Sequence, residues 1–368
     1  MLRGILVAGS VAALSMGSAL ADPPSAPSER TVTTFDVTNA TSTYPMGINA
    51  SGVVAGSWRD SGSLDHSFIR AANGTFTSFD APKVDFDAPK VDKDQFRGTY
   101  AQSINTSGVV AGAYNDGKKG VLTGFSRATN GKITSFSAAT SPKFDTSVSG
   151  LNDSGAIVGS YADKPGGYHG FLRTSDGTIT QFDAPGAAIG KAGAGTFPSA
   201  IDTSGAIAGT YDDKKHVSHG FLRAAAGTFT SFDDPSAGKK SFQGTRAMAM
   251  NDGGAVVGYY VDSGGVCHGF VRAASGTFTT LDAPGALLDA NQGTFAGAID
   301  SAGVVAGTYN AQDGTYHSFT RTAGGTYNTF TVDDDSTAVA NSGINTSGAV
   351  TGDYTDSSNA AHGFIANP

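Results

Sequence analysis

A tight-turn signature that recurs along nearly the whole chain limits the possible folds more than any other feature. It consists of Asn or Asp, any residue, usually Ser, and then Gly, and its final glycines are Gly52, Gly108, Gly155, Gly205, Gly254, Gly303 and Gly348. These glycines are 45 to 56 residues apart, which is the size of one propeller blade. The Asn or Asp side chain can accept hydrogen bonds from the following backbone, and glycine tolerates a positive φ. Each signature therefore predicts the turn of a β-hairpin.

The fourth unit shows the strands that we expect around each turn. Residues 197–202 and 206–211 flank the turn, and residues 219–223 and 228–232 follow as a third and a fourth strand. These runs are rich in β-branched and aromatic residues and are bounded by Gly, Asp or Pro, as strands are. Seven such units predict an all-β, seven-bladed β-propeller of four-stranded antiparallel blades. A stacked β-solenoid is the alternative, but its coils are usually shorter, about 20 to 30 residues.

The two ends of the repeat array complement each other. The last unit ends after its third-strand motif, residues 362–365, and lacks a fourth strand, whereas residues 31–36 closely match the fourth strand of the first unit, residues 75–80. Pairing the two ends would remove two open sheet edges. We therefore predict a single propeller domain over residues 30–368, closed by the N-terminal strand that completes the last blade.

The beginning of the chain predicts export. Arg3 precedes an apolar run over residues 5–16 and the small-residue pattern Ala19-Leu20-Ala21, which is typical of a signal peptide over residues 1–21. A Pro-rich linker over residues 22–29 follows. The apolar run is shorter than the roughly 18 residues that a membrane span needs, and the formal net charge of -8 argues against nucleic acid as a partner. We expect a secreted or periplasmic monomer without a membrane span.

The third strands carry a repeated His-Gly-Phe motif followed by an aliphatic residue and Arg. It occurs at residues 169–173, 219–223 and 268–272, with Ser in place of Gly at residues 66–68 and 317–319, while residues 123–125 of the second unit read Thr-Gly-Phe. Over nearly all of the predicted domain, the chain resembles the bacterial extracellular repeat family named for its His-Ala-Phe motif. The resemblance implies a propeller and export. It implies no chemistry, because the family has no common activity.

The histidines follow the repeat rather than forming one cluster. Six of the seven occupy the equivalent place in successive units: His66, His169, His219, His268, His317 and His362. Equivalent positions in different blades are too far apart to share an ion at ligand distances of about 2 Å. We therefore expect each histidine to form hydrogen bonds within its own blade, and we predict no metal site and no cofactor. The single cysteine, Cys267, excludes an intrachain disulfide.

Two sets of residues are candidates for ligand binding. At the start of the innermost strands, we expect Tyr44, Tyr100, Phe197, Arg246 and Phe295, with Ser147 and Ala340 at the remaining places, to surround the mouth of the central channel. Aromatic rings near an arginine suit a sugar or an anionic glycan, although the same residues could instead pack between blades. On the loop face, the candidates are Arg97, His216, Lys239, Lys240, Asp289 and Gln292. An acid/base role for His216 would require a carboxylate or tyrosine within hydrogen-bond reach.

These features favour an exported, non-enzymatic binding or scaffold propeller that holds a carbohydrate or a protein ligand on its loop face. No residue is assigned a catalytic role in this hypothesis. The alternative is an extracellular polysaccharide lyase or glycosidase of the propeller type, with Arg246, His216 and the mouth tyrosines in its site. A third possibility is a stable surface structure without a specific ligand.

Overall fold

The computed structural model describes residues 30–82, 97–115, 120–141, 143–163, 167–333, 336 and 338–368. The signal peptide predicted over residues 1–21 and the linker predicted over residues 22–29 lie outside this part of the chain. The described residues form an all-β structure of strands, turns and loops. They include no helix with the length and apolar character needed to cross a membrane.

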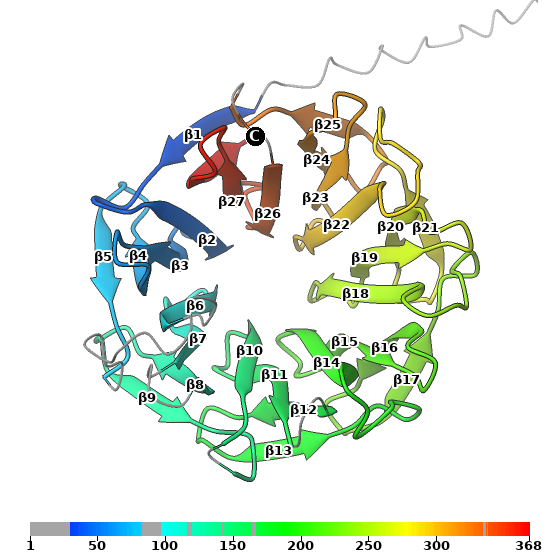
Figure 1. Cartoon of the computed structure of the whole chain (residues 1–368), viewed down its shortest axis with the longest axis horizontal. Coiled ribbons are helices and arrows are strands. Elements are labelled where there is room, and N and C mark those ends of the chain that lie inside the picture. The colour runs from blue at the N-terminus through cyan, green and yellow to red at the C-terminus, as the bar shows by residue number, and fades with distance from the viewer. Residues whose placement is uncertain are drawn as a thin grey trace, which may run out of the picture.

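The strands form successive antiparallel groups of four, arranged in a circle around a central axis (Figure 1). The first groups are β2 (Ser42–Ile48), β3 (Val54–Arg59), β4 (Asp65–Arg70) and β5 (Phe76–Phe79); β6 (Gly98–Ile104), β7 (Val110–Asn115), β8 (Leu122–Arg127) and β9 (Ile133–Phe136); and β10 (Thr146–Leu151), β11 (Ile157–Ala162), β12 (Gly167–Arg173) and β13 (Ile179–Phe182). Next come β14 (Ala194–Ile201), β15 (Ile207–Asp212), β16 (Ser218–Arg223) and β17 (Phe229–Phe232), and then β18 (Gly244–Met250), β19 (Val256–Val261), β20 (Cys267–Arg272) and β21 (Phe278–Leu281). The last groups are β22 (Thr294–Ile299), β23 (Val305–Asn310), β24 (Tyr316–Arg321) and β25 (Tyr327–Phe330), and β26 (Ala338–Ile344), β27 (Val350–Thr355) and β28 (Ala361–Asn367) together with β1 (Thr31–Phe35).

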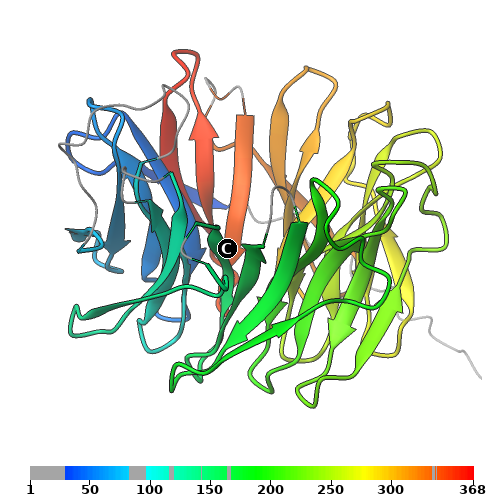
Figure 2. The same ribbon diagram turned by 60° about the horizontal axis from the view of Figure 1, so that its bottom comes forward.

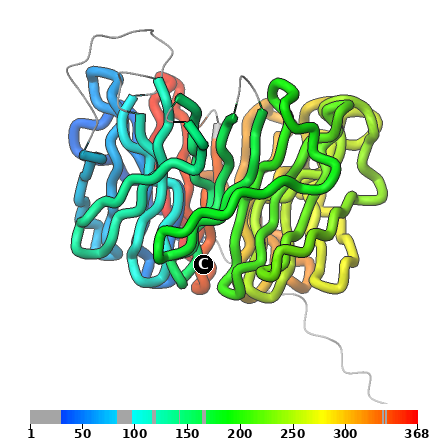
Figure 3. The backbone as a smooth tube through the Cα atoms, turned by 90° about the horizontal axis from the view of Figure 1, so that it is seen from below, coloured from blue at the N-terminus to red at the C-terminus, as the bar shows by residue number. Residues whose placement is uncertain are grey.

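Within each group, the first strand lies nearest the axis and the fourth lies at the outer edge (Figure 1). Because successive strands are antiparallel, the turns between first and second strands lie on one rim of the disk and the loops between second and third strands lie on the other (Figures 2 and 3). We call these the turn rim and the loop rim. Where the structure describes them, the loops from a fourth strand to the next group also lie on the loop rim, as the sequence predicts.

Adjacent groups are joined more closely than the prediction of separate four-stranded blades implies. Short parallel bridges link a third strand to the next first strand at Asp65 and Gly98, at Tyr168 and Gly195, and at Ser218 and Gly244. The hydrogen-bonded sheets therefore contain 4, 12, 8 and 4 strands. These bridges fix the first strands β6, β14 and β18 against the preceding groups.

A repeated bulge shapes the inner part of each group. In β18, the register shifts between Ala247 and Ala249, so the carbonyl of Arg246 projects toward Gly258 of β19. The glycine at this place accommodates the carbonyl because it has no side chain. The third strand packs a fully buried phenylalanine against the same region, and these core residues are Phe68, Phe125, Phe171, Phe221, Phe270, Phe319 and Phe364.

The N-terminal strand β1 pairs with β28, as the sequence predicts. Their antiparallel register runs from Thr31 opposite Asn367 to Phe35 opposite Gly363. The Arg70 guanidinium lies 4.8 Å from the Phe35 ring centroid. The corresponding arginines contact the fourth strand of the preceding group at 4.7 to 4.9 Å, through Arg127 and Phe79, Arg173 and Phe136, Arg223 and Phe182, and Arg272 and Phe232. The segment at the start of the described chain therefore makes the contacts of a fourth strand.

Most of the repeated histidines are held between two carboxylates. His169 Nδ1 lies 2.8 Å from Asp183 and Nε2 lies 3.3 Å from Asp163, and the ring stacks on Tyr161. Equivalent pairs involve His66, His219, His268 and His362. Among the described carboxylates, His317 contacts Asp313 alone, at 2.8 Å, and Thr331 stands where the units of the other five histidines have an aspartate after the fourth strand. The prediction that these histidines bond within their own units is confirmed for the described residues.

On the turn rim, the asparagines of the turn signature connect neighbouring groups. Asn105 Oδ1 accepts hydrogen bonds from its own turn, while its Nδ2 donates to the carbonyl of Asn152 in the next turn. Similar donations run from Asn49 to Asn105, from Asn152 to Asp202, from Asn251 to Asp300 and from Asn345 to Asn49. The last of these joins turns that are 296 residues apart.

Candidate functional site

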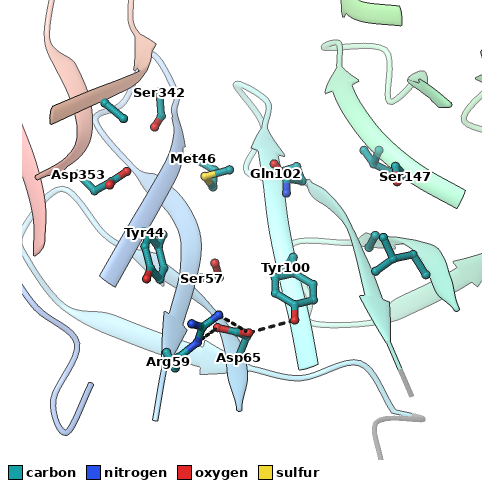
Figure 4. A pocket seen from close by; sticks show the side chains of 14 residues that line it. Tyr44, Met46, Ser57, Arg59, Asp65, Tyr100, Gln102, Ser147, Ser342 and Asp353 are labelled. Carbon is teal, nitrogen blue, oxygen red and sulfur yellow. Dashed lines mark hydrogen bonds and ion pairs between the residues drawn. The ribbon is translucent and has the colours of Figure 1, made fainter. Parts of the chain in front are cut away.

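A cavity of about 580 Å³ opens between the strands nearest the axis. We call it the central pocket, and its size is within the range of small-molecule sites. Its walls belong to β2, β3, β4, β6, β7, β8, β10, β26 and β27, so it occupies one arc of the channel. The lining residues are Tyr44, Met46, Ser57, Arg59, Asp65, Tyr100, Gln102, Ala113, Leu122, Ser147, Val148, Ala340, Ser342 and Asp353 (Figure 4).

A hydrogen-bonded triad lies at one end of the central pocket (Figure 4). Arg59 donates from Nε and Nη2 to the two oxygens of Asp65, at 2.9 and 3.1 Å, and the Tyr100 hydroxyl donates to Asp65 Oδ2 at 3.0 Å. The hydrogen bond from Arg59 to Asp65 raises the pKa of Arg59. Burial, with the nearby Asp65 charge, raises the pKa of Tyr100. The triad thus presents a fixed tyrosine ring and a neutralised ion pair.

Asp353 lies on another side of the same pocket, beside Tyr44 and Ser342 (Figure 4). No hydrogen bond or ion pair links its carboxyl group to another side chain in the part of the chain that the structure describes. Burial without such a partner raises the pKa of Asp353 from 3.8 to about 7, because desolvation disfavours the charged form. A carboxyl group of this kind can be either protonated or ionised near neutral pH.

Asp353 was missed by the sequence prediction, although the repeat contains a signal for it. The equivalent residue of each other second strand, directly before the conserved aromatic position, is Ser57, Ala113, Ser160, Thr210, Tyr259 or Thr308. Asp353 is the only charged residue at this place. A search of the aligned units for positions where one unit alone has a charged residue would have selected Asp353.

Replacement of the buried carboxyl group gives a pH-dependent stability prediction. In the unfolded chain, Asp353 would ionise near its usual value of 3.8, whereas in the folded chain it ionises near 7. The contribution of Asp353 to the folding stability is therefore fully present below about pH 4 and is lost as the pH rises to about 7. We expect Asp353→Asn to raise the thermal unfolding midpoint at pH 8 by several degrees and to leave it unchanged at pH 4. Asp289→Asn, at an exposed loop position, is the control, and an equal gain at both pH values would contradict the assignment.

The predicted channel-mouth residues do not all line one site. Tyr44 and Tyr100 line the central pocket, together with Ser147 and Ala340. Phe197 packs against Tyr168 of the preceding group, with ring centroids 5.3 Å apart. The structure thus brings the tyrosines together with Asp353 and uses Phe197 for contact between groups, which is the alternative that the sequence left open.

Arg246 and Phe295 lie around a different residue, Tyr259. The Arg246 guanidinium is 5.9 Å from the Tyr259 ring centroid, and the Phe295 ring meets Tyr259 edge-on with centroids 5.1 Å apart. Neither Arg246 nor Phe295 lines the central pocket. These two residues therefore lie around Tyr259 and outside the cavity that Tyr44 and Tyr100 line.

The loop-face candidates are also dispersed. Arg97 is only 8% exposed, which corrects its predicted place on an exposed loop; its carbonyl accepts a hydrogen bond from the backbone of Asp65, which holds it at the start of β6. Lys239 lines a separate hollow of about 230 Å³ with Lys215. Asp289 and Gln292 belong to one loop, in which the Gln292 N–H donates to the Asp289 carbonyl.

His216 occupies a turn with a φ of 59°. Its ring stacks on Phe242, which is 73% exposed, with centroids 6.0 Å apart. Among the described residues, no hydrogen bond joins the imidazole to a carboxylate or a tyrosine. The geometry therefore does not provide the partner that an acid/base role would need.

The described residues offer little support for a metal site or for a reactive thiol. They contain no group of three or more His, Cys, Asp and Glu side chains arranged to hold a metal ion. Cys267 is buried, and burial raises the pKa of its thiol, which disfavours the reactive thiolate. The chemistry available in the central pocket is hydrogen bonding, ring stacking and proton exchange at Asp353.

Comparisons with known proteins identify the fold. No protein-family profile matches the chain, and no curated protein matches it by sequence. Virginiamycin B lyase from Staphylococcus aureus matches with a TM-score of 0.56 and 15% identity, over 92% of this chain and 100% of that one. A streptogramin B lyase matches with a TM-score of 0.55 and 13% identity, over 92% and 98% of the two chains. These neighbours are β-propeller proteins, and at such identities the likeness shows the fold alone.

Proposed function

We propose that this chain is an exported, seven-bladed β-propeller, closed by its N-terminal strand, that binds a carbohydrate in its central pocket without the need for a metal or cofactor. The blade count and closure are supported by the turn repeats and by the pairing of β1 with β28. Export to the periplasm or the medium is supported by the sequence of residues 1–21 and by the resemblance to the His-Ala-Phe repeat family.

The observation that carries the proposed function is the combination of groups in the central pocket. A sugar presents apolar C–H faces and hydroxyl groups, so it needs both flat apolar surfaces and hydrogen-bonding partners. Tyr44 and Tyr100 supply rings, and Ser57, Gln102 and Ser342 supply hydrogen-bonding side chains. This arrangement supports a glycan rather than a protein as the ligand, and it supports binding inside the channel rather than on the loops.

Binding measurements on pocket variants test this function. We expect the oligosaccharide with the strongest signal on a glycan array to bind the wild-type chain in calorimetry. Because a stacked ring contributes about 0.5 to 1.5 kcal/mol, Tyr44→Ala should weaken binding by about twofold to twelvefold. Phe242→Ala removes a more exposed ring outside the pocket and should leave the affinity unchanged. Equal affinities for the wild type and Tyr44→Ala, or no binding to any glycan, would contradict the proposal.

A second candidate function is a lyase or glycosidase that acts on an extracellular polysaccharide, and Asp353 favours it. A pocket carboxyl group with a pKa of about 7 is suited to donate or accept a proton near neutral pH. The two structural neighbours are named as lyases, although their likeness is one of fold. Turnover of uronate-containing polymers that disappears in Asp353→Asn, while binding persists, would establish this function; Arg246 and His216 lie outside the pocket and should be dispensable.

A further inference from the structure

A second hollow faces the channel on the side opposite the triad. It has a volume of about 290 Å³ and is lined by residues of β18, β19, β22, β23, β24 and β26. We call it the aromatic hollow because Tyr259, Phe295 and Tyr316 contribute rings to it, together with Met248. None of its lining residues carries a charge, in contrast to the central pocket with Arg59 and Asp65.

Large apolar side chains are unusually exposed here. Met248 is 44% exposed and Tyr316 is 36% exposed, and both line the hollow. Exposed apolar groups that gather in one concavity indicate a surface that becomes covered by a ligand. The rings are also fixed in place, because Tyr259 and Phe295 pack edge to face.

The aromatic hollow adjoins the central pocket at β26. Ala340 lines both cavities, and its small side chain leaves little mass between them. Its two neighbours, Val339 and Asn341, contribute to the hollow, and Ser342 contributes to the pocket. A single ligand that occupies the pocket can therefore extend past Ala340 without leaving the channel.

We infer that the ligand is a glycoside with an apolar aryl or alkyl group, whose sugar occupies the central pocket and whose apolar group occupies the aromatic hollow. This inference rests on the proposed carbohydrate binding and names the ligand class for that site. A free sugar or an unsubstituted polysaccharide would leave the uncharged hollow with nothing to cover it. A phenyl ring fits within its volume, with room for a substituent, and suits its uncharged, aromatic lining.

Paired ligands with the same sugar test the inference. The probes are methyl and 4-nitrophenyl glycosides of glucose, galactose, mannose and glucuronic acid, titrated into the full chain by calorimetry. For the sugar that binds, we expect the 4-nitrophenyl glycoside to bind about tenfold more tightly than the methyl glycoside, because burial of the phenyl ring removes apolar surface from water. The gain should be lost in Met248→Ser and in Phe295→Ala, while the affinity for the methyl glycoside stays the same.

The controls separate this inference from the proposed function. Leu288→Ser, at an apolar loop residue that is 54% exposed, should retain the aryl gain. Because Met248 is partly exposed, Met248→Ser is expected to fold even if Phe295→Ala does not, and its thermal unfolding midpoint verifies this. Equal affinities of the methyl and aryl glycosides, or an aryl gain that survives Met248→Ser, would overturn the inference and leave carbohydrate binding intact. Failure of every glycoside to bind would overturn both.

Discussion

A chain without residues 30–36 is expected to lose on the order of 5 kcal/mol of unfolding free energy, because it gives up both a hydrogen-bonded strand and its apolar contacts. The deletion removes the ladder between β1 and β28 and the support that Phe35 gives to Arg70. It also removes Asp36, whose carboxylate contacts His362 at 2.8 Å. The edge of β28 would then be open, and an open edge pairs with other chains. We therefore also expect concentration-dependent association.

Thermal and urea unfolding, with light scattering, measure this result. Deletion of residues 22–29 is the matched control, since it shortens the chain without removing a described strand. A stronger test moves the strand instead of removing it, by attaching residues 30–36 after Pro368 through a five-residue turn. This variant should recover most of the lost stability, because a fourth strand would then follow β28 in the chain, as it follows the third strand in the other groups. If the deletion left the unfolding midpoint unchanged, the role of β1 as a structural fourth strand would be rejected.

Gly258→Ala is expected to be strongly destabilising for so small a substitution. A Cβ atom at this place would lie 1.9 Å from the carbonyl oxygen of Arg246, far inside any possible contact. The backbone of β18 would have to move at its bulge, and we expect a loss of about 3 kcal/mol, at the upper end of the usual cost of overpacking.

Urea unfolding of Gly258→Ala compared with Gly324→Ala measures this effect. At Gly324, the nearest atom to an added Cβ would be Thr322 Oγ1 at 3.8 Å, so that variant should lose little stability. The same contact recurs at the equivalent glycines, with a Cβ of Gly352 placed 1.8 Å from the Ala340 oxygen. Equal stabilities of the two variants would show that the bulge is more adaptable than its geometry indicates.

The strands and their pairing were predictable because each local signal is repeated many times. The fourth strand expected over residues 228–232 is β17, Phe229–Phe232, and the N-terminal strand expected over residues 31–36 is β1, Thr31–Phe35. The parallel bridges between groups were not predicted. They involve only one or two residue pairs, such as Asp65 with Gly98, and depend on how closely neighbouring groups approach.

The candidate site was predicted only in part. Tyr44 and Tyr100 were selected correctly as channel residues, because their register in the innermost strand follows from the turn. The separation of the channel into the central pocket and the aromatic hollow could not be derived from the sequence. It depends on side chains of the second strands, which project between neighbouring first strands. Asp353 belongs to such a strand. Arg97 follows a long loop in the sequence, yet the bond between its carbonyl and Asp65 holds it in the interior.

The asparagine contacts on the turn rim have a consequence for how such a chain can change in evolution. Each asparagine amide donates a hydrogen bond to a backbone carbonyl of the following turn, and the Asn345 amide donates to the carbonyl of Asn49 in the first turn. Any turn can accept this bond through its carbonyl, but only a turn with asparagine can donate it, so the turns at Asp202 and Asp300 receive without giving. Because the accepting group is a backbone carbonyl, duplication or loss of a whole module would still leave each asparagine amide a partner in the next turn, and the number of modules is constrained instead by the curvature that lets the first and last of them meet.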